Sequence, residues 1–159
     1  MKVRPVSAHD RERLAAILAE DTFVAGEVAV ALELIDSAIG SAEAPHADYR
    51  VLVAADEADR AIGYVCYGPT PMTQSTWDLY WLCTARAARG RGVGGALVTR
   101  MEQELARVGG RRVRLETSVE EAYGAARSFY QRHGFVETGR IADFYKPADD
   151  LLILCKRLD

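Results

Sequence analysis

At 159 residues the chain is long enough for one domain with its own hydrophobic core and too short for two. Hydrophobic residues make up 49% of the chain and charged residues 27%. Because apolar runs such as Leu151 to Cys155 are far too short to cross a bilayer and no signal-like stretch follows Met1, we expect a cytoplasmic protein without a membrane partner. The net charge of −3 argues against nucleic acid as the main partner.

The hydrophobic pattern predicts strands and helices in alternation. Runs rich in β-branched and aromatic residues predict strands, and apolar residues at helical spacing, such as Leu14, Ile17 and Leu18, predict helices. The predicted strands are residues 2–6, 50–55, 61–67, 77–84, 113–117, 136–145 and 151–157. The predicted helices follow Ser7 and cover residues 27–39, 96–108 and 123–133, with loops at 41–46, 68–75 and 85–95. The short charged turn at 56–60 predicts an antiparallel hairpin, and the whole pattern predicts one mixed α/β domain over residues 1–159.

The charges are unevenly distributed along the chain. Residues 1–60 hold twelve acidic and six basic residues, a local charge of −6. Residues 84–114 hold eight arginines and two glutamates, a local charge of +6. This asymmetry favours an anionic ligand near the arginines, although a solvated surface can have the same composition.

The cysteines and histidines do not indicate a metal site. Cys66, Cys83 and Cys155 are odd in number, widely spaced and outside any CxxC pattern, so we interpret them as free thiols in a reducing compartment. The three histidines are also scattered. We therefore expect no catalytic metal.

A glycine-rich segment between a predicted strand and a predicted amphipathic helix is the most informative part of the sequence. It comprises Arg89, Gly90, Arg91, Gly92, Val93, Gly94 and Gly95. Glycines let the backbone adopt positive φ and approach a ligand closely, and the first amides of a helix have no intrahelical partners. Together with the helix dipole and the two arginines, these features predict a pocket for an anionic pyrophosphate.

Two other nucleotide motifs fit this segment less well. Gly90, Gly92 and Gly95 match the GxGxxG dinucleotide pattern, with Glu116 about twenty residues further on. However, the five residues from Ala85 to Arg89 separate the glycines from the preceding strand, and little chain remains for further βαβ units. A P-loop is excluded because no GK[ST] follows. A purely structural glycine turn is the remaining alternative.

Two motifs resemble those of the GCN5-related N-acetyltransferase (GNAT) family, and their order and separation match as well. Residues 89–94 resemble the family's [QR]-x-x-G-x-[GA] motif, whose backbone amides hold the coenzyme A pyrophosphate. Residues 123–135 resemble its N-x-x-A-x-x-[FL]-Y-x-x-x-G-F block, with Tyr123 in place of the usual asparagine. The resemblance implies a single-domain acyl-CoA N-acyltransferase fold. Such a fold has a mixed, mostly antiparallel sheet of about seven strands with about four helices, splayed between the fourth and fifth strands.

The resemblance also implies a reaction. The chain would be an N-acetyltransferase that moves an acetyl group from acetyl-CoA directly to an amine. Leu82, Cys83 and Thr84 would offer their backbone to the pantetheine arm, as in strand addition to an open sheet edge. Cys83 is a second candidate, as an acyl-accepting nucleophile, but the neighbouring sequence offers no base to activate it.

Three residues are candidates for proton transfer. Tyr130 matches the family's tyrosine that protonates the leaving thiolate, although its helical stripe is also typical of a core residue. Glu116 resembles the glutamate that some members use as a general base, and Asp78 falls where others carry a glutamate. A chain of water molecules is the third option for the base.

The acceptor is less defined by the sequence. In the family, the first helices and the last two strands flank the acceptor, which places the acidic residues of 1–60 and Asp143, Phe144 and Tyr145 near it. An acceptor site with acidic and aromatic residues favours a cationic amine on a small molecule or a protein. An RNA acceptor is a further alternative. We also consider a homodimer. Two competing classes are a non-catalytic acyl-CoA-binding sensor, which would not need Tyr130 or Glu116, and a nicotinamide dinucleotide-binding protein.

Overall fold

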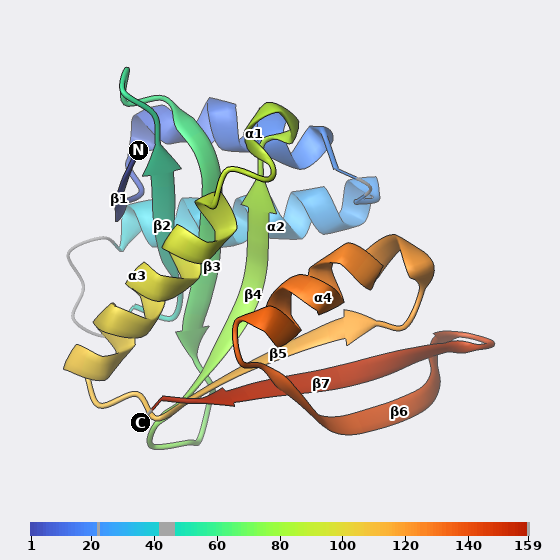
Figure 1. The fold of residues 1–159 in the computed structure, drawn as a ribbon. Coiled ribbons are helices and arrows are strands. Elements are labelled where there is room, and N and C mark those ends of the chain that lie inside the picture. Colours follow the sequence, from blue (N-terminus) through green and yellow to red (C-terminus); the bar gives the residue numbers. More distant parts are fainter. Residues whose placement is uncertain (22, 42–46, 159) are drawn as a thin grey trace.

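A computed structural model describes residues 1–21, 23–41 and 47–158. These residues form a seven-stranded sheet with helices on both faces (Figure 1). The strands are β1 (Lys2–Pro5), β2 (Arg50–Ala55), β3 (Ala61–Pro69), β4 (Thr76–Thr84), β5 (Arg112–Ser118), β6 (Val136–Lys146) and β7 (Asp149–Arg157). The helices are α1 (Arg11–Ala19), α2 (Ala25–Gly40), α3 (Val93–Arg107) and α4 (Gly124–Arg132), with single 3-10 turns at η1 (Ala8–Asp10), η2 (Arg86–Ala88) and η3 (Glu121–Tyr123).

The sheet is mixed and mostly antiparallel. Its strand order is β1-β2-β3-β4-β5-β7-β6, and β4 with β5 is the parallel pair among the described strands. The predicted hairpin of β2 and β3 is confirmed. This topology agrees with the fold that the motifs implied. It differs from the parallel βαβ units of a dinucleotide-binding fold, because β4, which leads into the glycine segment, pairs antiparallel with β3.

The helices cover the sheet because each has one apolar stripe. In α3 the buried residues recur at helical spacing and pack on the core that β2 and β3 also line, and α1 and α2 lie on the opposite face (Figure 1). The buried residues of α3 are Val93, Leu97, Val98, Met101 and Leu105. Among the described helices, none is long and apolar enough to cross a membrane.

Helix α3 begins earlier than predicted. Its first residue is Val93 rather than Ala96, so Gly94 and Gly95 belong to its first turn. Glycine is a poor helix former, which is why the pattern indicated a loop. A Cβ at Gly94 would lie 3.1 Å from the Phe129 ring, and one at Gly95 would lie 3.1 Å from Nε2 of His133. These two glycines therefore allow α3 and α4 to approach each other closely.

Smaller boundaries also differ from the prediction, and one predicted loop lies mostly outside the described residues. Strand β3 runs on to Pro69, so Gly68 and Pro69 are strand residues and not part of the predicted loop. Helix α4 begins at Gly124 after the turn η3, one residue later than predicted. Most of the predicted loop at 41–46 lies outside the described residues, because only Ser41 is described.

The two parallel strands at the centre of the sheet separate soon after they meet. β4 and β5 pair only over Thr76–Asp78 and Arg112–Arg114, whereas β5 pairs with β7 along its whole length. On its other side, β4 has a register shift against β3 between the partners of Leu79 and Trp81, which leaves Tyr80 as an extra, bulged residue. Beyond this point β4 and β5 diverge, and α4 lies beside the gap between them (Figure 1).

Candidate active site

The edge of β4 that faces the gap presents backbone groups that bond to no neighbouring strand. The amide of Ala85 donates to the Ile62 carbonyl at 2.9 Å, so the backbone of Ala85 faces β3. Backbone groups alternate in direction along an antiparallel strand, so Cys83 also bonds to β3 while Leu82 and Thr84 face the gap. Of the three predicted backbone contacts, the two that face the gap are therefore those of Leu82 and Thr84.

The glycine segment turns sharply into α3. Gly90 has a φ of 73° and Gly92 a φ of 79°, both in the left-handed region that favours glycine, and no atom lies within 4 Å of a Cβ built at either. The Ala96 amide donates to the Gly92 carbonyl at 3.0 Å, which is the first hydrogen bond of the helix. The amides of Val93, Gly94 and Gly95 therefore lie in the first turn, where they have no intrahelical partner. In the described part of the chain no side chain caps this helix end. These amides line a cavity of about 530 Å³, which we call the donor cavity.

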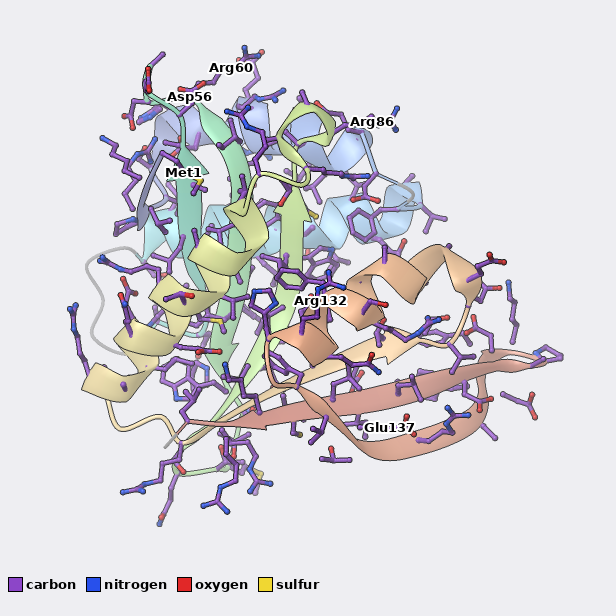
Figure 2. The ribbon with its side chains drawn as sticks, in the orientation of Figure 1. Met1, Asp56, Arg60, Arg86, Arg132 and Glu137 are labelled. Atoms are coloured by element: carbon purple, nitrogen blue, oxygen red, sulfur yellow. The ribbon has the colours of Figure 1, made fainter. Side chains whose placement is uncertain are left out.

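The arginines around the donor cavity differ in position. Arg89 lines it, but its guanidinium lies 3.0 Å from the Asp21 carboxylate and also donates to the Thr84 carbonyl at 3.3 Å. Arg91 is exposed and outside the lining. Arg132, labelled in Figure 2, lines the cavity from the last turn of α4 together with His133. Sequence reasoning missed Arg132, although its place three residues after Phe129 puts it on the same helix face.

Tyr130 lies where two cavities meet. It is 9% exposed, packs against Phe129 and Phe135, and with Leu82 and Ala126 lines both the donor cavity and a second one of about 450 Å³, which we call the acceptor cavity. Burial raises the pKa of Tyr130, and nearby Cys83 adds to the effect. The hydroxyl is therefore protonated at neutral pH, so it can act as a general acid but not as a general base.

The two candidate bases, Asp78 and Glu116, both accept a hydrogen bond from Arg114. Arg114 donates through Nε to Asp78 Oδ1 at 2.6 Å and through Nη1 to Glu116 Oε1 at 3.1 Å, and all three residues line the acceptor cavity. Asp78 is 6% exposed, whereas Glu116 is exposed. The register explains the contact, because Asp78 and Arg114 are direct neighbours at the point where β4 and β5 part. Sequence reasoning did not assign Arg114 to the site.

Cys83 lacks the features of a nucleophile. It is 2% exposed and lies outside the linings of both cavities. Burial raises the pKa of Cys83 to about 12, so the thiol stays neutral at physiological pH. Since the thiolate is the reactive form, this cysteine is a core residue.

The acceptor cavity is acidic and aromatic. Among its described lining residues, five carboxylates face the single guanidinium of Arg114. These carboxylates are Glu27, Asp78, Glu116, Glu120 and Asp149, and the aromatic side chains are Phe23, Tyr80, Trp81, Tyr123, Tyr130 and Tyr145. Of the acids in residues 1–60 that the structure describes, only Glu27 lies in this lining, and Tyr145 lines it while Asp143 and Phe144 do not. No group of side chains within the described ranges is arranged to hold a metal ion.

Comparison with known proteins identifies the family. Residues 47–137 match the model of the acetyltransferase (GNAT) domain, and no curated protein sequence matches the chain. A crystal structure from Desulfovibrio desulfuricans, described as a GNAT-family acetyltransferase, is 32% identical, with 99% of each chain covered and a TM-score of 0.89.

Two further solved structures share the fold at lower identity. An aminoglycoside 6'-N-acetyltransferase complexed with coenzyme A is 16% identical, with 100% of this chain and 98% of that chain covered and a TM-score of 0.77. A ribosomal-protein-alanine N-acetyltransferase from Brucella melitensis is 21% identical, with 99% and 100% covered and a TM-score of 0.76. With the family model over more than half of its length and a full-length structural relative, the chain belongs to the GNAT family of acetyltransferases.

Proposed function

We propose that this acetyltransferase moves an acetyl group from acetyl-CoA directly to an amine, without a covalent enzyme intermediate. The observation that supports this most is the junction of the two cavities at Leu82, Ala126 and Tyr130. A donor in one cavity and an amine in the other would meet at this junction, and proximity of this kind supplies much of the rate of a bimolecular transfer. The neutral thiol of Cys83 argues against a route through an acyl-cysteine.

The donor cavity fits a coenzyme A diphosphate. The amides of Val93, Gly94 and Gly95 lie at the positive end of the α3 dipole, and the empty space above Gly90 and Gly92 leaves room for phosphate oxygens. Arg132 adds positive charge from α4, and Arg89 and Arg91 stand at the turn itself. The pantetheine arm would then lie along the backbone of Leu82 and Thr84, which faces the gap.

Tyr130 is the proposed general acid for the departing thiolate. A free thiol has a pKa of about 8.5 and a free phenol one of about 10, so the two groups are close enough in acidity to exchange a proton. Burial raises the pKa of Tyr130, and the same burial disfavours a thiolate anion beside it, so the two pKa values rise together. The phenol therefore remains a suitable donor in this place.

Glu116 is the proposed general base for the attacking amine. Its carboxylate is exposed and held by a single contact to Arg114. Asp78 is buried and makes the shorter contact with the same guanidinium, which suits a supporting role in holding Arg114. A base is needed because an acidic cavity favours the protonated, unreactive form of an amine. The acidic and aromatic lining also favours a cationic acceptor.

The cysteines and strand β6 bear on the cellular compartment and the oligomeric state of the enzyme. Cys66, Cys83 and Cys155 are free, which suits the reducing cytoplasm. Strand β6 is one of the two edge strands of the sheet and exposes Val136, Ile141, Phe144 and Tyr145, as an interface would. We therefore include a homodimer through β6 in the proposal.

The diphosphate contact can be tested with two glycines of equal backbone strain. Gly92 and Gly109 both have positive φ, 79° and 77°, and no atom lies within 4 Å of a Cβ at either, but only Gly92 lines the donor cavity. Either alanine variant should lose about 1–2 kcal/mol of stability in urea unfolding. Only Gly92→Ala should weaken coenzyme A binding by calorimetry, by roughly tenfold or more. Equal affinity of the two variants would contradict the assignment.

The general acid can be tested by removing one hydroxyl. Tyr130→Phe should lower kcat about 100-fold, as is typical for a lost proton donor, while the affinity for coenzyme A stays the same. Release of free thiol from acetyl-CoA with a panel of amines measures the rate. An unchanged kcat would remove Tyr130 from the mechanism. If the wild-type protein bound coenzyme A but released no thiol with any amine, the chain would be an acyl-CoA sensor.

The general base can be tested through the pH dependence of the rate. A carboxylate base works only when ionised, so kcat/KM should fall as the pH drops through its titration. Glu116→Gln should lose this acidic limb and have a low rate at all pH values, whereas Asp78→Asn should keep the limb. Retention of the limb in Glu116→Gln would move the role to Asp78 or to water.

The homodimer can be tested by sedimentation. The wild-type protein should sediment as a dimer at micromolar concentration, and Ile141→Lys, which places a charge in the middle of exposed β6, should sediment as a monomer. A monomeric wild-type protein would disprove this part of the proposal.

A further inference from the structure

One buried carboxylate of the acceptor cavity has no cationic partner among the residues that the structure describes. Asp149, the first residue of β7, is 5% exposed and lines the cavity. Its Oδ1 accepts a hydrogen bond from the hydroxyl of Ser118, the last residue of β5, and nothing in the described parts of the chain donates to Oδ2. The ammonium of Lys146, which Asp149 influences electrostatically, pairs with Glu120 instead.

Burying a carboxylate without an opposite charge beside it costs free energy. Asp149 has lost most of its exposure to water, and its second oxygen stays open to the cavity without an opposite charge from the described residues beside it. A cation that enters the cavity from solvent would supply this opposite charge. Asp149 therefore favours a positively charged group in the cavity, independently of the number of acids around it.

Three further side chains are arranged around the same place. Glu27, from the first turn of α2, lines the cavity and uses one oxygen to accept the Val24 amide at 2.9 Å. Tyr123 and Tyr145 line it as well, and burial raises the pKa of both, with Glu27 and Asp149 adding to the shift in each case. Two aromatic rings in the field of two carboxylates provide the environment that an ammonium group prefers.

We propose that Asp149, with Glu27, Tyr123 and Tyr145, binds a second ammonium group of the acceptor, so that the substrate is a diamine or polyamine acetylated at one end. This inference rests on the proposed function, because the first amine is the one that reacts beside Tyr130. The group bound by Asp149 is not acetylated and serves to orient the acceptor.

The spacing of β5 sets the distance between the two amines. Arg114, Glu116 and Ser118 alternate along the strand and share one face. Glu116 and Ser118 are two residues apart, which corresponds to roughly 7 Å. An amine at Glu116 and an ammonium at Asp149 would thus be separated by a chain of about five carbon atoms, given bonds of about 1.5 Å in a zigzag.

Binding of matched ligands tests this inference. 1,5-Diaminopentane and 1-aminopentane have the same carbon chain and differ in one ammonium group, and each can be titrated into the protein in a calorimeter at neutral pH. We expect the diamine to bind the wild-type protein at least about tenfold more tightly. Asp149→Asn keeps the shape and the acceptor for the Ser118 hydroxyl but removes the charge, so the ratio should fall below about threefold. Glu121→Gln is the matched control, because Glu121 is exposed and outside the lining, and it should keep the wild-type ratio.

The outcomes separate this inference from the proposed function. Equal affinity of the wild-type protein for the two ligands, or an unchanged ratio in Asp149→Asn, would overturn the second ammonium site even if acetyl transfer occurs. A diamine preference that depends on Asp149 would support the site even if no thiol is released from acetyl-CoA. If Asp149→Asn does not fold, the test uses the wild-type protein alone and measures the ratio of its affinities for the diamine and the monoamine at rising salt concentration. A contact between charges weakens with ionic strength, so a ratio that falls with added salt supports the second ammonium site and a constant ratio contradicts it.

Discussion

The site depends on the early separation of β4 and β5. Two parallel strands that stayed paired would bond the backbone groups that face each other along their whole length, whereas here pairing ends at Asp78 and Arg114. The separation leaves backbone groups of β4 without a strand partner and opens a passage between the two faces of the sheet. Helices from both faces then line this passage, α2 from one side and α4 from the other. The donor and the acceptor can therefore approach one point from different directions.

Charge and burial divide the passage into chemically distinct parts. The donor side is lined by helix amides and arginines, and the acceptor side by carboxylates and aromatic rings. Arg114 lies at the point where β4 and β5 separate, and its guanidinium contacts both Asp78 and Glu116. Its positive charge allows the two carboxylates to lie close to each other. Tyr130 is the buried neutral group between the two sides. This order fits the proposed transfer from anionic acetyl-CoA to a cationic acceptor.

Features that depend on local pattern were predictable from the sequence. The β2–β3 hairpin and the helical stripes follow from residues close together in the chain, and the two motifs led to Tyr130 and the glycine turn. Arg114 was not predictable, because its contact with Asp78 depends on a parallel register between residues 36 positions apart. The same holds for Arg132, which depends on how α4 is rotated, and for Asp149, whose burial depends on where the β6–β7 hairpin ends.

The close contact of α3 and α4 has a mechanical consequence. A Cβ at Gly94 or Gly95 would lie 3.1 Å from the side chain of Phe129 or His133, so a larger residue at either position requires these side chains to shift. Tyr130 is carried on the same turn of α4 as these two residues. The proposed phosphate contact and the proposed proton donor therefore depend on the same helix contact, so a larger residue at the start of α3 would affect both.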